Sequence, residues 1–287
     1  MGRCDVCFRH CEIREGKRGF CGARICTKDK VRAENYGKIT SLALDPIEKK
    51  PLHRFYPGSM ILSVGSYGCN LRCPFCQNSQ ISWSEMALRG RTWAETVTAE
   101  ELVRTAEALK PQGNVGVAFT YNEPLVGWEF ILDTARLVHE AGMVNVLVTN
   151  GTAELHILEK LAPYIDAMNI DLKGFTDRYY TEILGGSLEM VKAFITRSVQ
   201  LCHVELTTLI VPGENDSTEE MHSLSSWVAG LTDASGKRIG SSVPLHISRF
   251  FPRFHMTDRG PTEIQHIYRL AEEAGKQLEF VYPGNVP

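Results

Sequence analysis

The stretch Gly65-Ser66-Tyr67-Gly68-Cys69-Asn70-Leu71-Arg72-Cys73-Pro74-Phe75-Cys76-Gln77-Asn78 follows a short apolar run at residues 61–64. It holds three cysteines, Cys69, Cys73 and Cys76, at gaps of four and three residues. Thiolates are the usual protein ligands of iron–sulfur clusters, commonly four to a [4Fe–4S] cluster. Because no fourth cysteine follows nearby, the spacing predicts a [4Fe–4S] cluster with one iron left open for an outside ligand.

Two other interpretations of this loop compete with the open cluster. It could form a structural zinc site completed by a distant ligand, or a plain electron-transfer cluster. Structural zinc sites usually combine Cys-x-x-Cys pairs or cysteine with histidine, and this loop has no histidine. The cysteine pattern therefore favours the cluster.

The rest of the chain predicts an α/β fold. Thr98-Ala99-Glu100-Glu101 is a capping box that opens one of several amphipathic segments with helical periodicity. Such segments separate strand-sized apolar runs, which imply a parallel sheet covered by helices, either doubly wound or a partial barrel. Polar residues at the carboxyl ends of the strands should then line the site. The apolar runs lie at residues 61–64, 115–120, 144–149, 168–172, 204–211, 245–250 and 278–281.

Composition excludes several classes of protein. The net charge of −3 provides no global basic field for nucleic acid. The apolar runs are far shorter than the roughly 20 residues that cross a bilayer, and the first residues lack the apolar core of a signal peptide. We therefore expect a soluble, cytoplasmic protein that binds neither nucleic acid nor membrane.

A second group of cysteines lies at the N-terminus, in the order Cys4-x2-Cys7-x3-Cys11-x9-Cys21. Four thiolates suit a closed tetrahedral zinc ion or an auxiliary iron–sulfur cluster, and spacing alone does not decide between them. The alternative is a loosely ordered segment with free cysteines. We expect residues 1–58 to form a Cys-rich N-terminal segment with short strands, and residues 59–287 to form the core domain.

With these motifs in view, the sequence resembles the radical S-adenosylmethionine (SAM) superfamily, whose C-x3-C-x2-C signature carries an aromatic residue before the last cysteine, here Phe75. The resemblance implies a partial (β/α)6 TIM-like barrel in which the open iron chelates SAM. It also implies an electron donor such as ferredoxin or flavodoxin. One electron then cleaves SAM to methionine and a 5′-deoxyadenosyl radical, which takes a hydrogen atom from the substrate.

Residues after two strands fit this resemblance. Tyr121-Asn122-Glu123-Pro124 resembles the superfamily's Gly-Gly-Glu-Pro segment, which binds the SAM ammonium group. Glu123 is a natural partner for an ammonium group, although a solvated loop glutamate is the alternative. Asn150, in Thr149-Asn150-Gly151, resembles a position that faces SAM, but Asn-Gly is also a common turn.

Further along, the Asp171-Leu172-Lys173 segment resembles the glycyl-radical-enzyme activases, where this Asp and Lys approach SAM or substrate. Strand alternation directs Asp171 and Lys173 to the same face, so they are candidate catalytic residues or a structural ion pair. His246, on the sixth strand, is a candidate cavity residue, although a strand histidine is more often part of a core.

Longer runs resemble a particular group, the radical SAM member of the AmmeMemoRadiSam system, which is similar to pyruvate formate-lyase-activating enzymes. They are the N-terminal cysteine run, Asp45-Pro46-Ile47-Glu48-Lys49-Lys50-Pro51-Leu52, Pro57-Gly58-Ser59 and Cys76-Gln77-Asn78, which adds Asn78 to the expected cofactor-binding residues. Memo-like and AMMECR-type proteins are the partners that this resemblance implies. Members usually continue past the Gly-Asn-Val-Pro segment into a tail with a Cys-x-x-Cys pair.

Three functions are therefore in view. The first is a radical SAM enzyme that abstracts a hydrogen atom from a small-molecule substrate. The second is an activating enzyme that generates a glycyl radical on a partner enzyme. The third is a non-catalytic iron–sulfur electron-transfer protein, which leaves the open iron without a purpose.

Overall fold

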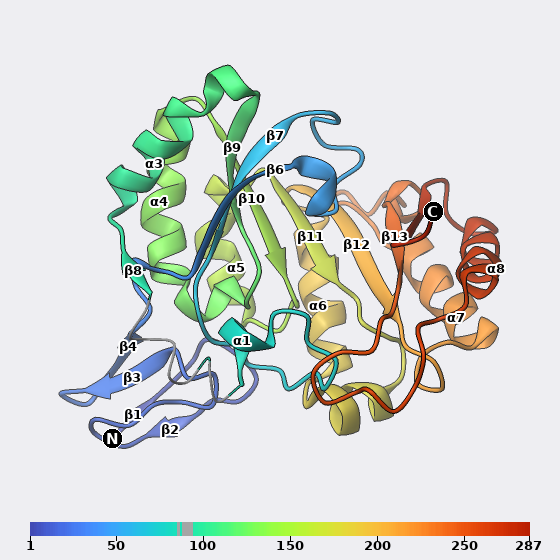
Figure 1. The fold of residues 1–287 in the computed structure, drawn as a ribbon, viewed down its shortest axis with the longest axis horizontal. Coiled ribbons are helices and arrows are strands. Elements are labelled where there is room, and N and C mark those ends of the chain that lie inside the picture. Colours follow the sequence, from blue (N-terminus) through green and yellow to red (C-terminus); the bar gives the residue numbers. More distant parts are fainter. Residues whose placement is uncertain (85–86, 88–93) are drawn as a thin grey trace.

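The computed structural model describes residues 1–84, 87 and 94–287. Its centre is an eight-stranded sheet in the order β14-β13-β12-β11-β10-β9-β7-β6 (Figure 1). The strands from β7 to β14 pair in parallel, and β6 pairs antiparallel to β7 at one edge. This arrangement confirms the predicted α/β partial barrel.

The edge strand β6 has no counterpart among the predicted apolar runs, and the seven parallel strands match those seven runs. The last strand begins three residues later than the predicted run, because residues 278–280 form an irregular connection before it. The bounds are β6 (Ser41–Pro46), β7 (Met60–Gly65), β9 (Asn114–Phe119), β10 (Val144–Thr149), β11 (Ala167–Asp171), β12 (His203–Ile210), β13 (Leu245–Arg249) and β14 (Val281–Gly284).

Helices connect the parallel strands and flank the sheet (Figure 1). Thr98 makes the predicted capping box at the start of α3, and Ser217 caps α7. Each helix buries an apolar stripe; in α8 the stripe is Ile267, Leu270 and Ala274. Their bounds are α1 (Ser79–Ser82), α3 (Ala99–Ala108), α4 (Trp128–Glu140), α5 (Leu155–Leu161), α6 (Leu188–Ser198), α7 (Thr218–Ala229) and α8 (Ile264–Gly275), with a π-helical turn at Tyr179–Leu184.

The N-terminal segment lies beside the end of the sheet towards which the parallel strands run (Figure 1). It contains two small antiparallel pairs, and a third pair joins residues 38–39 to residues 95–96. The expected boundary at residue 58 falls after β6, which is already an edge strand of the main sheet, so the division at residue 58 remains a proposal based on composition. These strands are β1 (Gly2–Arg3), β2 (Glu12–Ile13), β3 (Arg24–Thr27), β4 (Lys30–Ala33), β5 (Lys38–Ile39) and β8 (Glu95–Thr96).

Among the described residues, no helix combines the length and the apolar composition that crossing a bilayer requires.

Candidate active site

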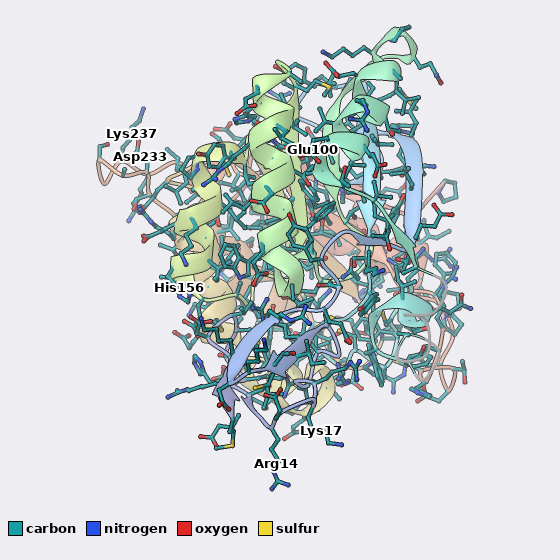
Figure 2. All side chains as sticks on the ribbon, turned by 90° about the vertical axis from the view of Figure 1, so that its left-hand side faces the viewer. Arg14, Lys17, Glu100, His156, Asp233 and Lys237 are labelled. Carbon is teal, nitrogen blue, oxygen red and sulfur yellow. The ribbon has the colours of Figure 1, made fainter. Side chains whose placement is uncertain are left out.

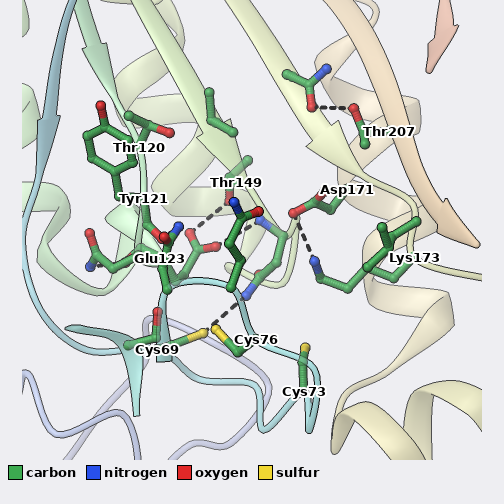
Figure 3. Close-up of a pocket in the computed structure, with 18 of the residues that line it drawn as sticks. Cys69, Cys73, Cys76, Thr120, Tyr121, Glu123, Thr149, Asp171, Lys173 and Thr207 are labelled. Atoms are coloured by element: carbon green, nitrogen blue, oxygen red, sulfur yellow. Dashed lines mark hydrogen bonds and ion pairs between the residues drawn. The ribbon is translucent and has the colours of Figure 1, made fainter. Parts of the chain in front are cut away.

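A cavity of about 310 Å³ lies at the carboxyl ends of the parallel strands, where α/β folds place their sites (Figure 3). Cys69, Cys73 and Cys76 form part of its wall. The side chains that follow β9, β10 and β11 face them across the cavity, among them Glu123 and Asn150. The predicted cysteine loop and the predicted strand ends therefore meet in one place.

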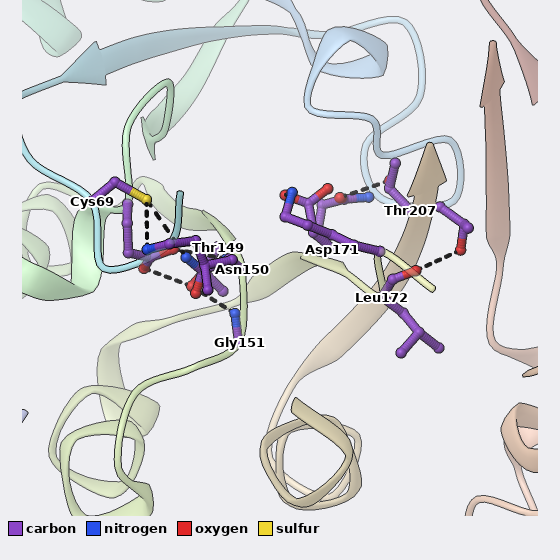
Figure 4. Close-up of polar contacts among 12 residues, drawn as sticks. Cys69, Thr149, Asn150, Gly151, Asp171, Leu172 and Thr207 are labelled. Atoms are coloured by element: carbon purple, nitrogen blue, oxygen red, sulfur yellow. Dashed lines mark hydrogen bonds and ion pairs between the residues drawn. The ribbon is translucent and has the colours of Figure 1, made fainter. Parts of the chain in front are cut away.

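The three cysteines are free thiols in a largely buried loop. Burial raises the pKa of all three, for Cys73 to about 11, because it disfavours the thiolate. Hydrogen bonds favour the thiolate at Cys69, whose Sγ accepts from the Leu71 amide at 3.4 Å and from Asn150 Nδ2 at 3.9 Å (Figure 4). A positive group bound between the sulfurs is what would keep such thiols deprotonated.

The spacing of these sulfurs is wider than a single shared zinc ion allows. The four thiolates of a tetrahedral zinc ion lie about 3.8 Å apart, given a Zn–S distance of about 2.3 Å. In the part of the chain that the structure describes, the three sulfurs do not all come within 4.8 Å of one another. Thiolates bound to separate irons of a cluster sit farther apart than thiolates sharing one ion, so Cys69, Cys73 and Cys76 suit three corners of a [4Fe–4S] cluster.

Two glycines of the 65–78 stretch, Gly65 and Gly68, have close neighbours within the protein. Gly68 has φ +99°, and a Cβ there would lie 2.7 Å from Ala23 Cβ and 2.9 Å from the Cys21 carbonyl oxygen. A Cβ at Gly65 would lie 2.8 Å from the Tyr121 ring. Their missing side chains therefore admit the N-terminal segment and Tyr121 against the cysteine loop.

Glu123 is a buried carboxylate at the end of β9, with 3% of its surface exposed. Its oxygens accept hydrogen bonds from the Leu125 amide at 3.0 Å, and from the Thr149 hydroxyl and the Asn150 amide at 2.8 Å each. Burial nevertheless raises the pKa of Glu123 to about 7. A carboxylate has about four acceptor positions, so a bound ammonium group could take the remaining one and stabilise the charge.

Tyr121 stands where the superfamily pattern has glycine, and the structure shows why glycine is common there. Its φ is +74°, a left-handed conformation that costs a bulky residue of the order of 1 kcal/mol. The Tyr121 hydroxyl donates to Asp45 Oδ2 at 2.7 Å. Asn122 holds the other side of the turn, accepting from the Ser66 amide at 3.0 Å and donating to the Gly68 carbonyl at 3.1 Å.

Asn150 and Asn78 both line the cavity, as expected. Asn150 Nδ2 donates to Asn70 Oδ1 at 2.9 Å, which ties the end of β10 to the cysteine loop (Figure 4). Asn78 Nδ2 donates to the Tyr121 carbonyl at 2.7 Å. Each side chain therefore links the cysteine loop to a strand end that faces it.

Asp171 and Lys173 also line the cavity, and Lys173 Nζ lies 2.9 Å from Asp171 Oδ2 (Figure 3). Burial alone would lower the pKa of Lys173, but the Asp171 carboxylate outweighs burial and raises it. The Tyr180 hydroxyl accepts from the Lys173 amide at 3.0 Å. The pair is thus both an ion pair and a part of the cavity wall.

One wall of the cavity was not anticipated from the sequence. Lys49, Lys50 and Pro51, between β6 and β7, line it opposite the strand ends. Lys50 is 3% exposed and lies 2.8 Å from Asp45 Oδ2, while Asn169 Nδ2 donates to the Pro51 carbonyl at 2.7 Å. Residues 47–54, named here the strap, thus reach from the sheet edge at β6 to the middle strands. In the sequence, this segment is marked only as part of the 45–52 run that resembles the AmmeMemoRadiSam group.

His246, expected as a candidate cavity residue, is not in the cavity lining. Its Nε2 lies 2.6 Å from Glu205 Oε2. The same carboxylate accepts from the His53 and Arg54 amides at 3.0 and 2.7 Å and lies 3.0 Å from His203 Nε2. His246 is a core histidine, and with Glu205 it holds the far end of the strap.

The comparisons with known proteins identify the family. The radical SAM superfamily model matches residues 63–224, more than half of the chain. An uncharacterized protein of Methanocaldococcus jannaschii is 41% identical over 292 residues, covering 99% of this chain and 81% of that protein. The pyruvate formate-lyase-activating enzyme of Clostridium pasteurianum is 28% identical over 186 residues, covering 62% of this chain and 72% of that enzyme.

Solved structures agree on the fold. Streptococcus suis SuiB bound to its precursor peptide SuiA superposes with a TM-score of 0.58 at 14% identity, covering 83% of this chain and 51% of that one. The hydrogenase maturase HydG gives a TM-score of 0.55 at 13% identity, covering 77% of this chain and 50% of that one. The chain therefore belongs to the radical SAM superfamily, is related to pyruvate formate-lyase-activating enzymes, and is a radical SAM enzyme. Membership implies a [4Fe–4S] cluster and SAM as cofactors.

Proposed function

We propose that this enzyme binds its [4Fe–4S] cluster through Cys69, Cys73 and Cys76 and abstracts a hydrogen atom from a small-molecule substrate, as a member of an AmmeMemoRadiSam system. The convergence of the cysteine loop and Glu123 on one cavity carries this proposal. When bound and reduced, the cluster supplies the electron that cleaves SAM into methionine and a 5′-deoxyadenosyl radical.

The protein's own residues have defined roles in this proposal. Glu123 accepts the SAM ammonium group at its remaining acceptor position, and Asn150 fixes that strand end against the loop. Asp171 and Lys173 form a polar pair that hydrogen-bonds SAM or substrate. Glu123, Thr149 and Asn150 in the cavity wall are buried, so this part of the wall limits the access of water to a reactive radical.

The strap supports a small substrate rather than a protein loop. It crosses from β6 towards β11 and β12, and its backbone is held by Glu205 and Asn169. Lys50 and Pro51 thereby occupy one side of the cavity. Because the cluster and SAM would occupy the same cavity of about 310 Å³, the space left beside the strap suits a small ligand and leaves little room for an inserted segment of a partner enzyme.

The glycyl-radical alternative is supported by the relationship to an activating enzyme. The two can be separated with the reconstituted enzyme, SAM and a reductant. A small-molecule substrate predicts that the low-molecular-weight filtrate of a cell extract stimulates 5′-deoxyadenosine formation, whereas the retained proteins do not. Stimulation by the retained proteins alone, with a glycyl radical signal in electron paramagnetic resonance (EPR), would overturn the small-molecule proposal.

The proposed partners can be tested with purified components. If the Memo-like and AMMECR-type proteins share the pathway, adding them should increase substrate turnover without changing SAM cleavage in the absence of substrate.

A further inference from the structure

We propose that Cys4, Cys7, Cys11 and Cys21 bind a second iron–sulfur cluster, and that this cluster passes electrons to the cysteine loop at Cys69. The evidence that the second site holds a cluster comes from the N-terminal segment alone. Its role as an electron relay rests on the proposed function of the Cys69 loop.

The four cysteines come together in the N-terminal segment. The Cys4 amide donates to the Cys11 carbonyl at 2.9 Å, next to the β1–β2 pair, and Cys4 and Cys7 are both buried. The Gly22 amide donates to the Gly19 carbonyl at 3.0 Å, so the chain turns at Cys21, and a Cβ on Gly19 would lie 3.6 Å from Cys11 Sγ. The turn that carries Cys21 therefore packs close to Cys11.

Their spacing favours a cluster over zinc. Within the described residues, no three of these four sulfurs lie within 4.8 Å of one another. A single zinc ion would require about 3.8 Å between all of them. Four thiolates on separate irons of a cluster are spaced more widely, as at the Cys69 loop.

The backbone of this segment touches the Cys69 loop directly. The Cys69 amide donates to the Cys21 carbonyl at 3.3 Å, and only a glycine fits at position 68 because Cys21 and Ala23 fill the space of a Cβ. Cys7 also forms an antiparallel bridge with Ala153, just after Asn150. A path of few covalent bonds and one hydrogen bond thus joins Cys21 to Cys69.

Two arginines lie between the two sets of cysteines. The guanidinium groups of Arg9 and Arg72 pack on the Phe20 ring, at 3.3 and 3.8 Å from its centroid. Arg9 donates to the Asn70 carbonyl at 2.8 Å, and Arg72 donates to the Phe20 carbonyl at 2.5 Å. Thiolate-bound clusters are anionic, so these two cations stabilise the reduced state of both and offset the repulsion between them.

The outer side of the segment suits an acidic electron donor. On residues 1–33, seven exposed Lys and Arg face solvent against four exposed Asp and Glu, since Arg24 is buried against Glu129 and Arg9 packs on Phe20. Arg14 and Lys17 project into solvent at the tip of the segment (Figure 2). A low-potential acidic protein docked here would lie nearer to the second cluster than to the cavity.

The electron transfer balances as single-electron steps. A reduced donor protein gives one electron to the second cluster, which then gives one electron to the cluster at Cys69, Cys73 and Cys76. No bond is formed or broken, and no proton is transferred, before SAM is cleaved.

Metal analysis and spectroscopy test the identity of the second site. The triple variant C69A/C73A/C76A, reconstituted anaerobically, should keep at least about two irons per chain with matching sulfide, and its reduced EPR signal should not respond to SAM. The variant C4S/C7S/C11S/C21S should lose that iron and keep a signal that SAM alters, and C202S is the matched control for loss of a free cysteine. Zinc, or no iron, in the triple variant would overturn the proposal, even if the quadruple variant fails to fold.

Donor dependence tests the relay. With the quadruple variant, 5′-deoxyadenosine formation driven by reduced ferredoxin or flavodoxin should fall at least about tenfold relative to wild type, whereas dithionite should still support it. Equal loss with both reductants, in a variant whose Cys69 cluster is fully loaded, would overturn the relay. A wild-type chain with two clusters but no SAM cleavage would instead refute the proposed function.

Discussion

Two buried glutamates, Glu123 and Glu205, lie in the same barrel and have opposite acid–base behaviour. Glu205 is fully buried, yet the two histidines and two backbone amides around it outweigh burial and lower its pKa to about 2. Glu123 accepts three hydrogen bonds from neutral donors, and burial still raises its pKa to about 7. Glu205 has hydrogen-bond partners that stabilise its charge, so we interpret it as a structural carboxylate. Glu123 lies at the edge of a cavity and has no cationic partner among the described residues, so it is suited to bind a cation.

Removing the Glu205 carboxylate should produce the largest change in stability. The substitution E205A leaves the His53 and Arg54 amides and two histidines without their acceptor, so we expect a loss of about 3–5 kcal/mol in the free energy of unfolding. Urea denaturation measures this, and E123A serves as the matched control with a much smaller loss. Equal losses for the two variants would remove the distinction between a structural and a ligand-binding glutamate.

The second-largest change in stability should come from lowering the pH, which protonates Glu205. The pKa of Glu205 is lower in the folded state, at about 2, than in an unfolded chain, at about 4.3. Its contribution is therefore complete above the unfolded pKa and is lost as the pH falls from about 4.3 towards 2, by about 3 kcal/mol in total. Unfolding measured between pH 6 and 3 should be steeper for wild type than for E205Q; parallel curves would contradict this assignment.

Neutralising Glu123 should affect SAM and leave stability almost unchanged. The substitution E123Q keeps the shape but removes the charge that an ammonium group would meet, so SAM affinity should fall about 10- to 100-fold. Equilibrium binding to the reconstituted enzyme measures this, with E205Q, folded at neutral pH, as the control that keeps its affinity. Unchanged SAM affinity in E123Q would show that the cavity glutamate has no such role.

The smallest effect should come from Tyr121, at the edge of the cavity. Y121F removes the hydrogen bond to Asp45 but keeps the left-handed backbone, so it should cost about 1 kcal/mol. Y121A and Y121G both remove the ring, but only Y121G relieves the left-handed strain, so Y121G should be the more stable of these two by about 1 kcal/mol. Thermal denaturation compares the two, and equal stabilities of Y121A and Y121G would contradict the strain argument.

Local patterns predicted the parts of the site that depend on short spacing. Cys69, Cys73 and Cys76 share one loop, and Glu123, Asn150 and Asp171 each lie at or just after the end of an apolar run, so their convergence follows from the parallel sheet. Capping residues such as Thr98 also marked helix starts correctly. In these cases the information lies within a few residues of the feature that it predicts.

Contacts between distant segments were not predictable in this way. Glu205 binds amides about 150 residues away. The sequence placed His246 on the sixth strand but did not give its depth in the barrel, and depth decides between the cavity and the core. The strap carries no periodicity that would place Lys50 in the cavity wall. The tyrosine at position 121, where the superfamily pattern has glycine, is explained only by its hydrogen bond to Asp45, which the sequence does not predict.

The most direct test of the central claim is 5′-deoxyadenosine formation by the anaerobically reconstituted, reduced enzyme with SAM. We expect the product from wild type, none from C69A/C73A/C76A, and much less from E123Q at limiting SAM. A wild-type enzyme with a fully loaded cluster that forms no 5′-deoxyadenosine would contradict the account.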